Sequence, residues 1–235
     1  YRYVPGSYPP IQSAIEAAND RDIVQLAEGV HALAGIIVSG KDVRITSANP
    51  DDAGVVENTI IMPDVSDDGY LKAAFEFVGC TRNTVLDGIT IKDYIVEGLN
   101  GKDGDPDKWG YDGRPAQGVA GAGVKCINSS PVIRNCRFIN CGAVGGDGGE
   151  GVEGVVDLGA VPSVYHPDGG HGGWPGYAYG GAIAVYSHYS PTGQEEQYPL
   201  VESCVFEDCF AVGGDGGDGG NAYDSDEYDG VGGRG

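Results

Sequence analysis

The sequence predicts an all-β fold, a parallel β-helix solenoid in which short strands stack coil upon coil. The first observation is an internal repeat, because PVIRNCRFINCGAVGGDGGEG (131–151) recurs in altered form as PLVESCVFEDCFAVGGDGGDG (199–219). The second is a series of short β-rich segments, such as DIVQLA, DVRITSA and TVLDGITI, that alternate apolar and polar residues. The third is that the connections are too short for the crossover helices of a βαβ sheet.

The first expected unit is an N-terminal segment over residues 1–20, which contains an amphipathic capping helix over residues 9–20. Pro9 and Pro10 suit a helix start. A helix before the first strand would cover the apolar end of the stack and protect its edge from aggregation, although an ordinary surface helix has the same pattern. No helical periodicity follows residue 20. The apolar face of the helix comprises Ile11, Ala14, Ile15 and Ala18.

The solenoid is expected to occupy residues 21–235 and to carry long glycine-rich inserts at about 95–120, 142–178 and 210–235. Aligning the repeats places equivalent residues of successive coils above one another in a core ladder. Free thiols packed as small apolar groups are expected for its cysteines. Disulfides remain an alternative in an oxidising compartment, because stacked strands lie about 4.8 Å apart. The ladder residues are Cys136, Phe138, Cys141, Cys204, Phe206 and Cys209.

The glycine runs GGDGGEGVE (145–153) and GGDGGDGGN (213–221) admit three interpretations. They approximate the nonapeptide that binds Ca²⁺ in β-rolls, with carboxylates as hard oxygen ligands. They also suit extended, polyproline II-like glycine strands that bond to one another, similar to the glycine bundles at the receptor-binding tips of some phage tail fibres. A flexible loop is the third interpretation. The candidate Ca²⁺ ligands, which include two residues of the acidic tail, are Asp147, Glu150, Asp215, Asp218, Asp224 and Asp226.

Aromatic residues gather in YHPDGGHGGWPGYAY (165–179). They are predicted either to stack on the sugar rings of a glycan or to pack the insert against its neighbours. His166 and His171, together with Asp168, also form a weak candidate for a transition-metal site. The candidate glycan-stacking or loop-packing aromatics are Tyr165, Trp174, Tyr177 and Tyr179.

The formal net charge of −21 argues against binding to nucleic acid or to anionic membranes. No apolar stretch approaches the roughly 20 residues that span a bilayer. A polysaccharide lyase needs a basic residue and a cation, and basic residues are sparse. A glycoside hydrolase needs paired carboxylates, for which Asp87, Asp93 and Asp208 are conceivable. None of these forms a distinctive constellation, so no catalytic residue is predicted and catalysis is disfavoured.

Two sets of motifs resemble known families. IQSAIEAAND (11–20), followed by IIVSGKDVRITS (36–47), is similar to the opening of secreted bacterial right-handed parallel β-helix proteins. GGAI (180–183) and NCRFINC (135–141) look like repeats of the polymorphic outer membrane protein type. The resemblance implies a right-handed solenoid and an extracellular or cell-surface location, but the fold does not decide the function.

These observations predict a non-catalytic extracellular or cell-surface module with a structural or adhesive role, such as part of a fibre. The expected partners are further solenoid coils or copies of the chain itself, with glycans as possible ligands and Ca²⁺ as the candidate cofactor. A start at Tyr1 and an uncovered last coil suggest a processed or excerpted chain. The alternative is a glycan-active enzyme of the polysaccharide lyase type.

Overall fold

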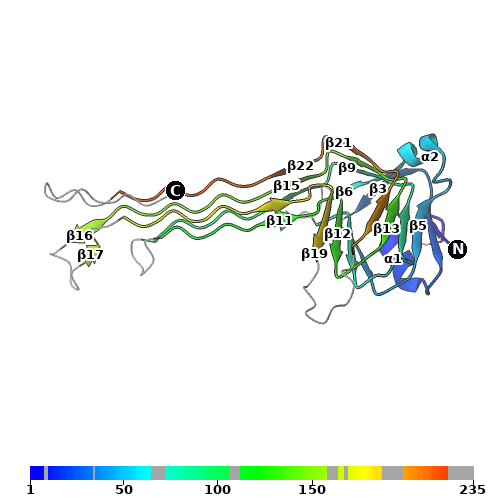
Figure 1. Cartoon of the computed structure of the whole chain (residues 1–235), viewed down its shortest axis with the longest axis horizontal. Coiled ribbons are helices and arrows are strands. Elements are labelled where there is room, and N and C mark those ends of the chain that lie inside the picture. The colour runs from blue at the N-terminus through cyan, green and yellow to red at the C-terminus, as the bar shows by residue number, and fades with distance from the viewer. Residues whose placement is uncertain are drawn as a thin grey trace. The chain divides into compact units, whose positions relative to one another are not determined.

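The computed structural model describes residues 1–7, 10–33, 35–64, 72–105, 112–157, 164–166, 169–186 and 198–221. The fold is all-β, as predicted, and most of its strands lie in parallel sheets (Figure 1). The chain forms two compact units, which we call the stacked-strand unit and the glycine unit. The stacked-strand unit comprises Tyr1–Val96, Ala120–Ala143 and Tyr179–Ala211. The glycine unit comprises Glu97–Val119, Val144–Ala178 and Val212–Gly235.

Three parallel sheets make up most of the stacked-strand unit. The first, in spatial order, contains β1 (Arg2–Val4), β2 (Ile23–Leu26), β5 (Arg44–Ser47), β8 (Val85–Asp87), β13 (Val132–Arg134) and β20 (Leu200–Glu202). The second contains β3 (Gly29–Leu33), β6 (Thr59–Pro63), β9 (Thr90–Lys92), β14 (Arg137–Ile139) and β21 (Val205–Glu207). The third contains β4 (Ile36–Ser39), β7 (Phe75–Val78), β12 (Val124–Ile127) and β19 (Ile183–Tyr186).

Three smaller sheets complete the described strands. One contains β10 (Ile95–Glu97), β15 (Gly142–Val144) and β22 (Phe210–Val212). A second pairs β11 (Val119–Ala120) with β18 (Ala178–Tyr179). The third is an antiparallel pair of β16 (Val155–Asp157) and β17 (Val164–His166).

The chain visits the three main sheets in the same order on each round. Neighbouring strands within a sheet are therefore one round apart in the sequence, and their register aligns equivalent residues. In the first sheet Ile45 pairs with Leu86, and Leu86 pairs with Ile133, all three being fully buried. In the second sheet Phe138 pairs with Phe206, with the ring centroids 5.1 Å apart and nearly parallel. Columns of apolar side chains thus build the core.

Residues in the left-handed backbone region recur at the corners of successive rounds. Gly88 and Asn135 follow β8 and β13 with φ of 67° and 53°. Asp93 and Asn140 follow β9 and β14 with φ of 60° and 50°. Glycine, asparagine and aspartate tolerate this conformation better than other residues. The amide of Asn140 also donates to Asp93 Oδ1 at 2.9 Å, so the corner side chains bridge successive rounds.

The expected N-terminal helix is α1 (Ile11–Ala17), which packs against β1, β2 and β4. All four residues of its predicted apolar face are buried. A second helix, α2 (Ala53–Asn58), was not predicted, so the expectation of no helix after residue 20 is wrong. Asp52 caps it by accepting from the backbone N–H groups of Gly54 and Val55. Only Val56 of this short helix is buried, so it leaves no periodic signal in the sequence.

None of the helices in the described part of the chain is both long and apolar enough to cross a bilayer.

Candidate functional site

The glycine unit contains five extended segments that lie outside the strands β1 to β22. We call them the first to the fifth glycine segment, and Figure 1 shows them running side by side. Four of them carry glycine at every third position or more often, whereas the second has glycine only at positions 113 and 118. Their residues are 98–105 for the first, 112–118 for the second, 145–154 for the third, 169–177 for the fourth and 213–221 for the fifth.

Backbone hydrogen bonds join parallel glycine segments at every third residue. Gly98, Gly101 and Gly104 donate to the carbonyls of Val144, Asp147 and Glu150 at 2.7–2.8 Å. The third segment bonds to the fifth in the same way, through Gly145, Gly148, Gly151 and Gly154. A period of three residues is that of the polyproline II conformation, whose backbone makes no internal hydrogen bonds. Each segment therefore satisfies its backbone through its neighbours.

The second and fourth segments run in the opposite direction and form a second layer. Gly113 of the second segment donates to His171 O of the fourth at 2.7 Å, which joins the two within their layer. Bonds between the layers are antiparallel, as when Gly173 donates to Gly149 O at 2.7 Å and Gly217 donates to Gly173 O at 3.0 Å. The described residues of the glycine runs are thus ordered, bonded strands.

Glycine is required here because the backbones approach closely. A Cβ added to Gly149 would lie 2.0 Å from Lys102 O, and one added to Gly217 would lie 2.0 Å from Gly149 O. A left-handed conformation is not the reason, since the glycines with positive φ in the described residues all lie outside the five segments. Packing of peptide groups against peptide groups therefore replaces side-chain packing in this unit.

The third residue of each triplet faces outward, and in the first, third and fifth segments it is often acidic. A side chain of the neighbouring segment accepts from the backbone N–H of three of these residues. Asp215 N donates to Asp147 Oδ1, Asp147 N donates to Asn100 Oδ1, and Glu150 N donates to Asp103 Oδ1, each at 2.9 Å. The acidic side chains thus complete the hydrogen bonding of the backbone.

Four of the six candidate Ca²⁺ ligands, Asp147, Glu150, Asp215 and Asp218, lie exposed along the third and fifth segments. Asp224 and Asp226 lie outside the described residues. Within the part of the chain that the structure describes, no group of three or more His, Cys, Asp or Glu side chains is close enough to hold a metal ion. Calcium binding stays a prediction.

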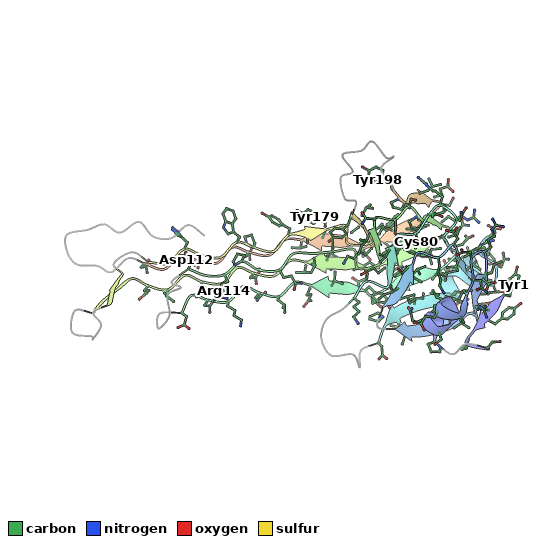
Figure 2. All side chains as sticks on the ribbon, turned by 90° about the horizontal axis from the view of Figure 1, so that it is seen from below. Tyr1, Cys80, Asp112, Arg114, Tyr179 and Tyr198 are labelled. Atoms are coloured by element: carbon green, nitrogen blue, oxygen red, sulfur yellow. The ribbon has the colours of Figure 1, made fainter. Side chains whose placement is uncertain are left out.

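The outward residues of the fourth segment are aromatic rather than acidic. His171, Trp174 and Tyr177 follow one another at intervals of three, with Trp174 72% and Tyr177 61% exposed. They border a cavity of about 850 Å³ on this unit. Asp112, which Figure 2 labels, contributes a carboxylate to its lining. The complete lining is Asp112, Gly113, His171, Gly172, Gly173, Trp174, Pro175, Tyr177 and Gly216.

We call this cavity the aromatic pocket. The backbone that carries its rings is held by hydrogen bonds at each ring residue. His171 N donates to Asp112 Oδ1 at 2.8 Å. Ala116 N donates to Trp174 O at 2.9 Å, and Val119 N donates to Tyr177 O at 2.8 Å. The rings therefore stand on a backbone that is held in place before any ligand arrives. Among the residues that the structure describes, neither lysine nor arginine lines the pocket.

The structure brings two of the four candidate aromatics, Trp174 and Tyr177, to this pocket. Tyr179 belongs to the stacked-strand unit, is 61% exposed and does not line it. Tyr165 lies in β17, but its side chain is outside the described part, as are Asp168 and the side chain of His166. Asp112 was missed as a pocket residue, because only the bond between the second and fourth segments places it there.

The carboxylates considered for hydrolysis hold the stacked rounds together. Asp87 is fully buried and accepts from Arg44 at 2.6 Å, from Arg134 Nε at 2.9 Å and from Asn135 at 3.0 Å. Arg44 and Arg134 come from the strands on either side of β8, so this network spans three rounds. Asp93 and Asp208 occupy left-handed corner positions. Each of the three thus has a place in the architecture of the stack.

The six cysteines carry free thiols. Burial raises the pKa of Cys126 and of Cys141 to about 12. Burial also raises the pKa of Cys136, whose thiol is hydrogen-bonded to that of Cys204 on the next round. The hydrogen bond with Cys136 lowers the pKa of Cys204, which is only partly buried. A nucleophilic cysteine needs a lowered pKa, so Cys126, Cys136 and Cys141 are suited to packing rather than to covalent catalysis.

The chain was compared with protein-family models, with curated proteins and with solved structures, and none of the three comparisons gave a match.

Proposed function

We propose that this chain is a non-catalytic structural and adhesive module of an extracellular or cell-surface protein. The observation that carries the proposal is the glycine unit, in which bonded glycine segments present an open aromatic pocket. Such a surface offers rings for stacking and polar groups for hydrogen bonds, which supports a role in binding. The placement of Asp87 and the buried cysteines within the stacked rounds supports the same conclusion.

The test of this function combines binding with turnover. The chain is incubated with a panel of acidic and neutral polysaccharides, with calcium or with chelator, and both co-sedimentation and new reducing or unsaturated ends are measured. Binding to at least one polysaccharide without new chain ends is expected. Depolymerisation of any polysaccharide in the panel would favour the lyase or hydrolase alternative and overturn the proposal.

We also propose that the stacked-strand unit is a right-handed parallel β-helix. Three parallel sheets visited in a fixed order support this architecture. Connections between parallel strands of one sheet are right-handed in almost all proteins, which supports the handedness. The helix α1, with its buried apolar face against β1, β2 and β4, would be its N-terminal cap.

Further coils or another copy of the chain are the proposed partners at the last round. β19, β20 and β21 each end their sheet among the described residues, so one edge of each backbone remains without a strand partner there. Phe206 is 48% exposed, whereas its partner Phe138 on the preceding round is fully buried. Val201 and Val205 are exposed beside it. An apolar row next to open strand edges favours the addition of more strands.

This partner prediction is tested with Phe206→Asp. We expect the unmodified chain to self-associate in sedimentation velocity and the variant to be monomeric, because a carboxylate in the apolar row opposes stacking. Ile37→Asp is the matched control, since Ile37 is an exposed apolar residue in a strand well before the last round, and it should leave self-association unchanged. An unmodified chain that stays monomeric at all concentrations would contradict self-association.

A further inference from the structure

We infer that the aromatic pocket binds neutral pyranose rings of an extended glycan, which stack on Trp174 and Tyr177. This inference rests on the proposed adhesive function and names its ligand class.

The spacing of the rings fits an extended ligand. A polyproline II segment makes one turn in three residues and rises about 3.1 Å per residue, so residues at intervals of three lie on the same side, about 9 Å apart. His171, Trp174 and Tyr177 therefore form a row along the fourth segment. A row of flat side chains offers successive contacts to a chain of rings, whereas a compact ligand would need a closed pocket.

A sugar can stack only on an aromatic ring whose face is open to solvent, and the rings of Trp174 and Tyr177 are exposed. The Trp174 side chain is 72% exposed and that of Tyr177 is 61% exposed, although both residues occupy ordered backbone. Indole and phenol rings combine a large apolar face with a polar group, which suits sugars, since these present apolar C–H faces and polar edges. Asp112 and His171 supply polar groups at the rim for sugar hydroxyls.

The backbone bonds beside the rings reduce the entropic cost of binding. Trp174 lies between Gly173, whose N–H donates to Gly149 O at 2.7 Å, and Pro175, whose ring fixes φ. The Trp174 carbonyl accepts from Ala116 of the second segment, and the Tyr177 carbonyl accepts from Val119 of β11. A preorganised surface loses little freedom when the ligand binds.

Charge selects a neutral glycan over an acidic one. The described lining includes Asp112 and neither lysine nor arginine, and the chain has a net charge of −21. A uronic acid or sulfate group would meet like charge, with no cation among the described lining residues to pair with it. Neutral sugars avoid this repulsion, and their hydroxyls can donate to the carboxylate.

The experiment measures binding of four neutral oligosaccharides, cellohexaose, mannohexaose, laminarihexaose and chitohexaose, to the full chain by calorimetry. Oligogalacturonate is the anionic comparison. At least one neutral oligosaccharide should bind, and oligogalacturonate should bind at least tenfold more weakly. Trp174→Ala should weaken binding about tenfold, which corresponds to about 1.4 kcal/mol of lost contact. Tyr177→Ala should also weaken it.

Tyr179→Ala is the matched control, because Tyr179 is as exposed as Tyr177 but does not line the pocket, and it should bind as the unmodified chain does. Thermal unfolding of all three variants should match that of the unmodified chain, since the rings are exposed. Three results would overturn the inference: no binding of any neutral oligosaccharide, equal losses in Trp174→Ala and Tyr179→Ala, or a preference for oligogalacturonate. Oligosaccharide cleavage would instead overturn the proposed function.

Discussion

At the scale of single residues, glycine has two different roles in this protein. At corners such as Gly88 it provides a positive φ of 67°. In the glycine unit it provides room, because the carbonyl of a neighbouring segment occupies the place of a Cβ. The two roles predict different mutational patterns.

Two adjacent glycines of the fifth segment test the second role. A Cβ at Gly214 would lie 2.0 Å from Gly146 O, whereas one at Gly213 would meet Gly176 O at an ordinary 3.7 Å. We expect Gly214→Ala to destabilise the glycine unit by about 1–3 kcal/mol, the usual cost of overpacking, and Gly213→Ala to have little effect. Hydrogen exchange of the Gly145 and Gly148 amides, which bond to this segment, is the measurement. Equal protection in both variants would contradict close approach as the reason for glycine.

The buried thiols predict a dependence of stability on pH. The pKa of Cys126 and of Cys141 is raised to about 12 in the folded protein from an ordinary value of 9.0, so folding favours the neutral thiol. The corresponding stabilisation is complete below about pH 9 and falls as pH rises toward about 12, because only the unfolded chain then ionises freely. The free energy of unfolding should fall by on the order of 4 kcal/mol per thiol across this range.

Chemical denaturation at a series of pH values measures this fall. The double variant Cys126→Ala/Cys141→Ala is the control, since tyrosine and lysine also titrate in this range and their contribution remains. An unmodified chain with the same pH slope as the double variant would show that the two thiols do not contribute.

At the scale of elements, the triplet pattern makes the glycine segments sensitive to register. Deleting Gly216 alone would bring Asp218 to the position of a packed glycine in the remainder of the fifth segment, whereas deleting Gly216–Asp218 would remove one whole turn and restore the pattern. We expect the single deletion to abolish protection of the Gly151 amide, whose partner is Asp218 O. The triplet deletion should preserve this protection, because Asn221 then takes the place of Asp218. Equal loss in both deletions would contradict the three-residue period.

The elements differ in how far the sequence predicts them. The helix over 9–20 was predictable because its buried residues recur at helical spacing. β1 was missed, since three residues at a chain end carry too little pattern, and its place is set by pairing of Arg2–Val4 with β2. The register of Phe138 with Phe206 followed from the repeat, because identical spacing in successive rounds places equivalent side chains together.

The aromatic pocket was predictable only in part. Trp174 and Tyr177 stood out as aromatic residues among glycines. Asp112 and Gly216 reach the pocket through hydrogen bonds between distant segments, and the sequence carries no local signal for such pairings. The acidic residues suggested metal ligation, which stays a prediction. The bonds that Asp103 and Asp147 accept from backbone N–H groups of neighbouring segments had no signal in the sequence.

At the scale of the whole molecule, the two compact units satisfy their backbone hydrogen-bonding groups in different ways. The stacked-strand unit pairs its strands in sheets and buries columns of aliphatic and aromatic side chains, such as Ile45, Leu86 and Ile133. The glycine unit pairs polyproline II-like segments in two layers and packs peptide groups. Three segments of the chain, each following a round of the stacked-strand unit, supply the glycine unit.

The packing of peptide groups in the glycine unit has a thermodynamic consequence. Exposing hydrocarbon to water raises the heat capacity, while exposing peptide groups lowers it. Unfolding of the glycine unit therefore has a small heat-capacity change. Its free energy of unfolding varies less with temperature than that of a unit with an apolar side-chain core. Hydrophobic stabilisation weakens on cooling. At low temperature the glycine unit should therefore retain more of its stability than the apolar core of the stacked-strand unit does.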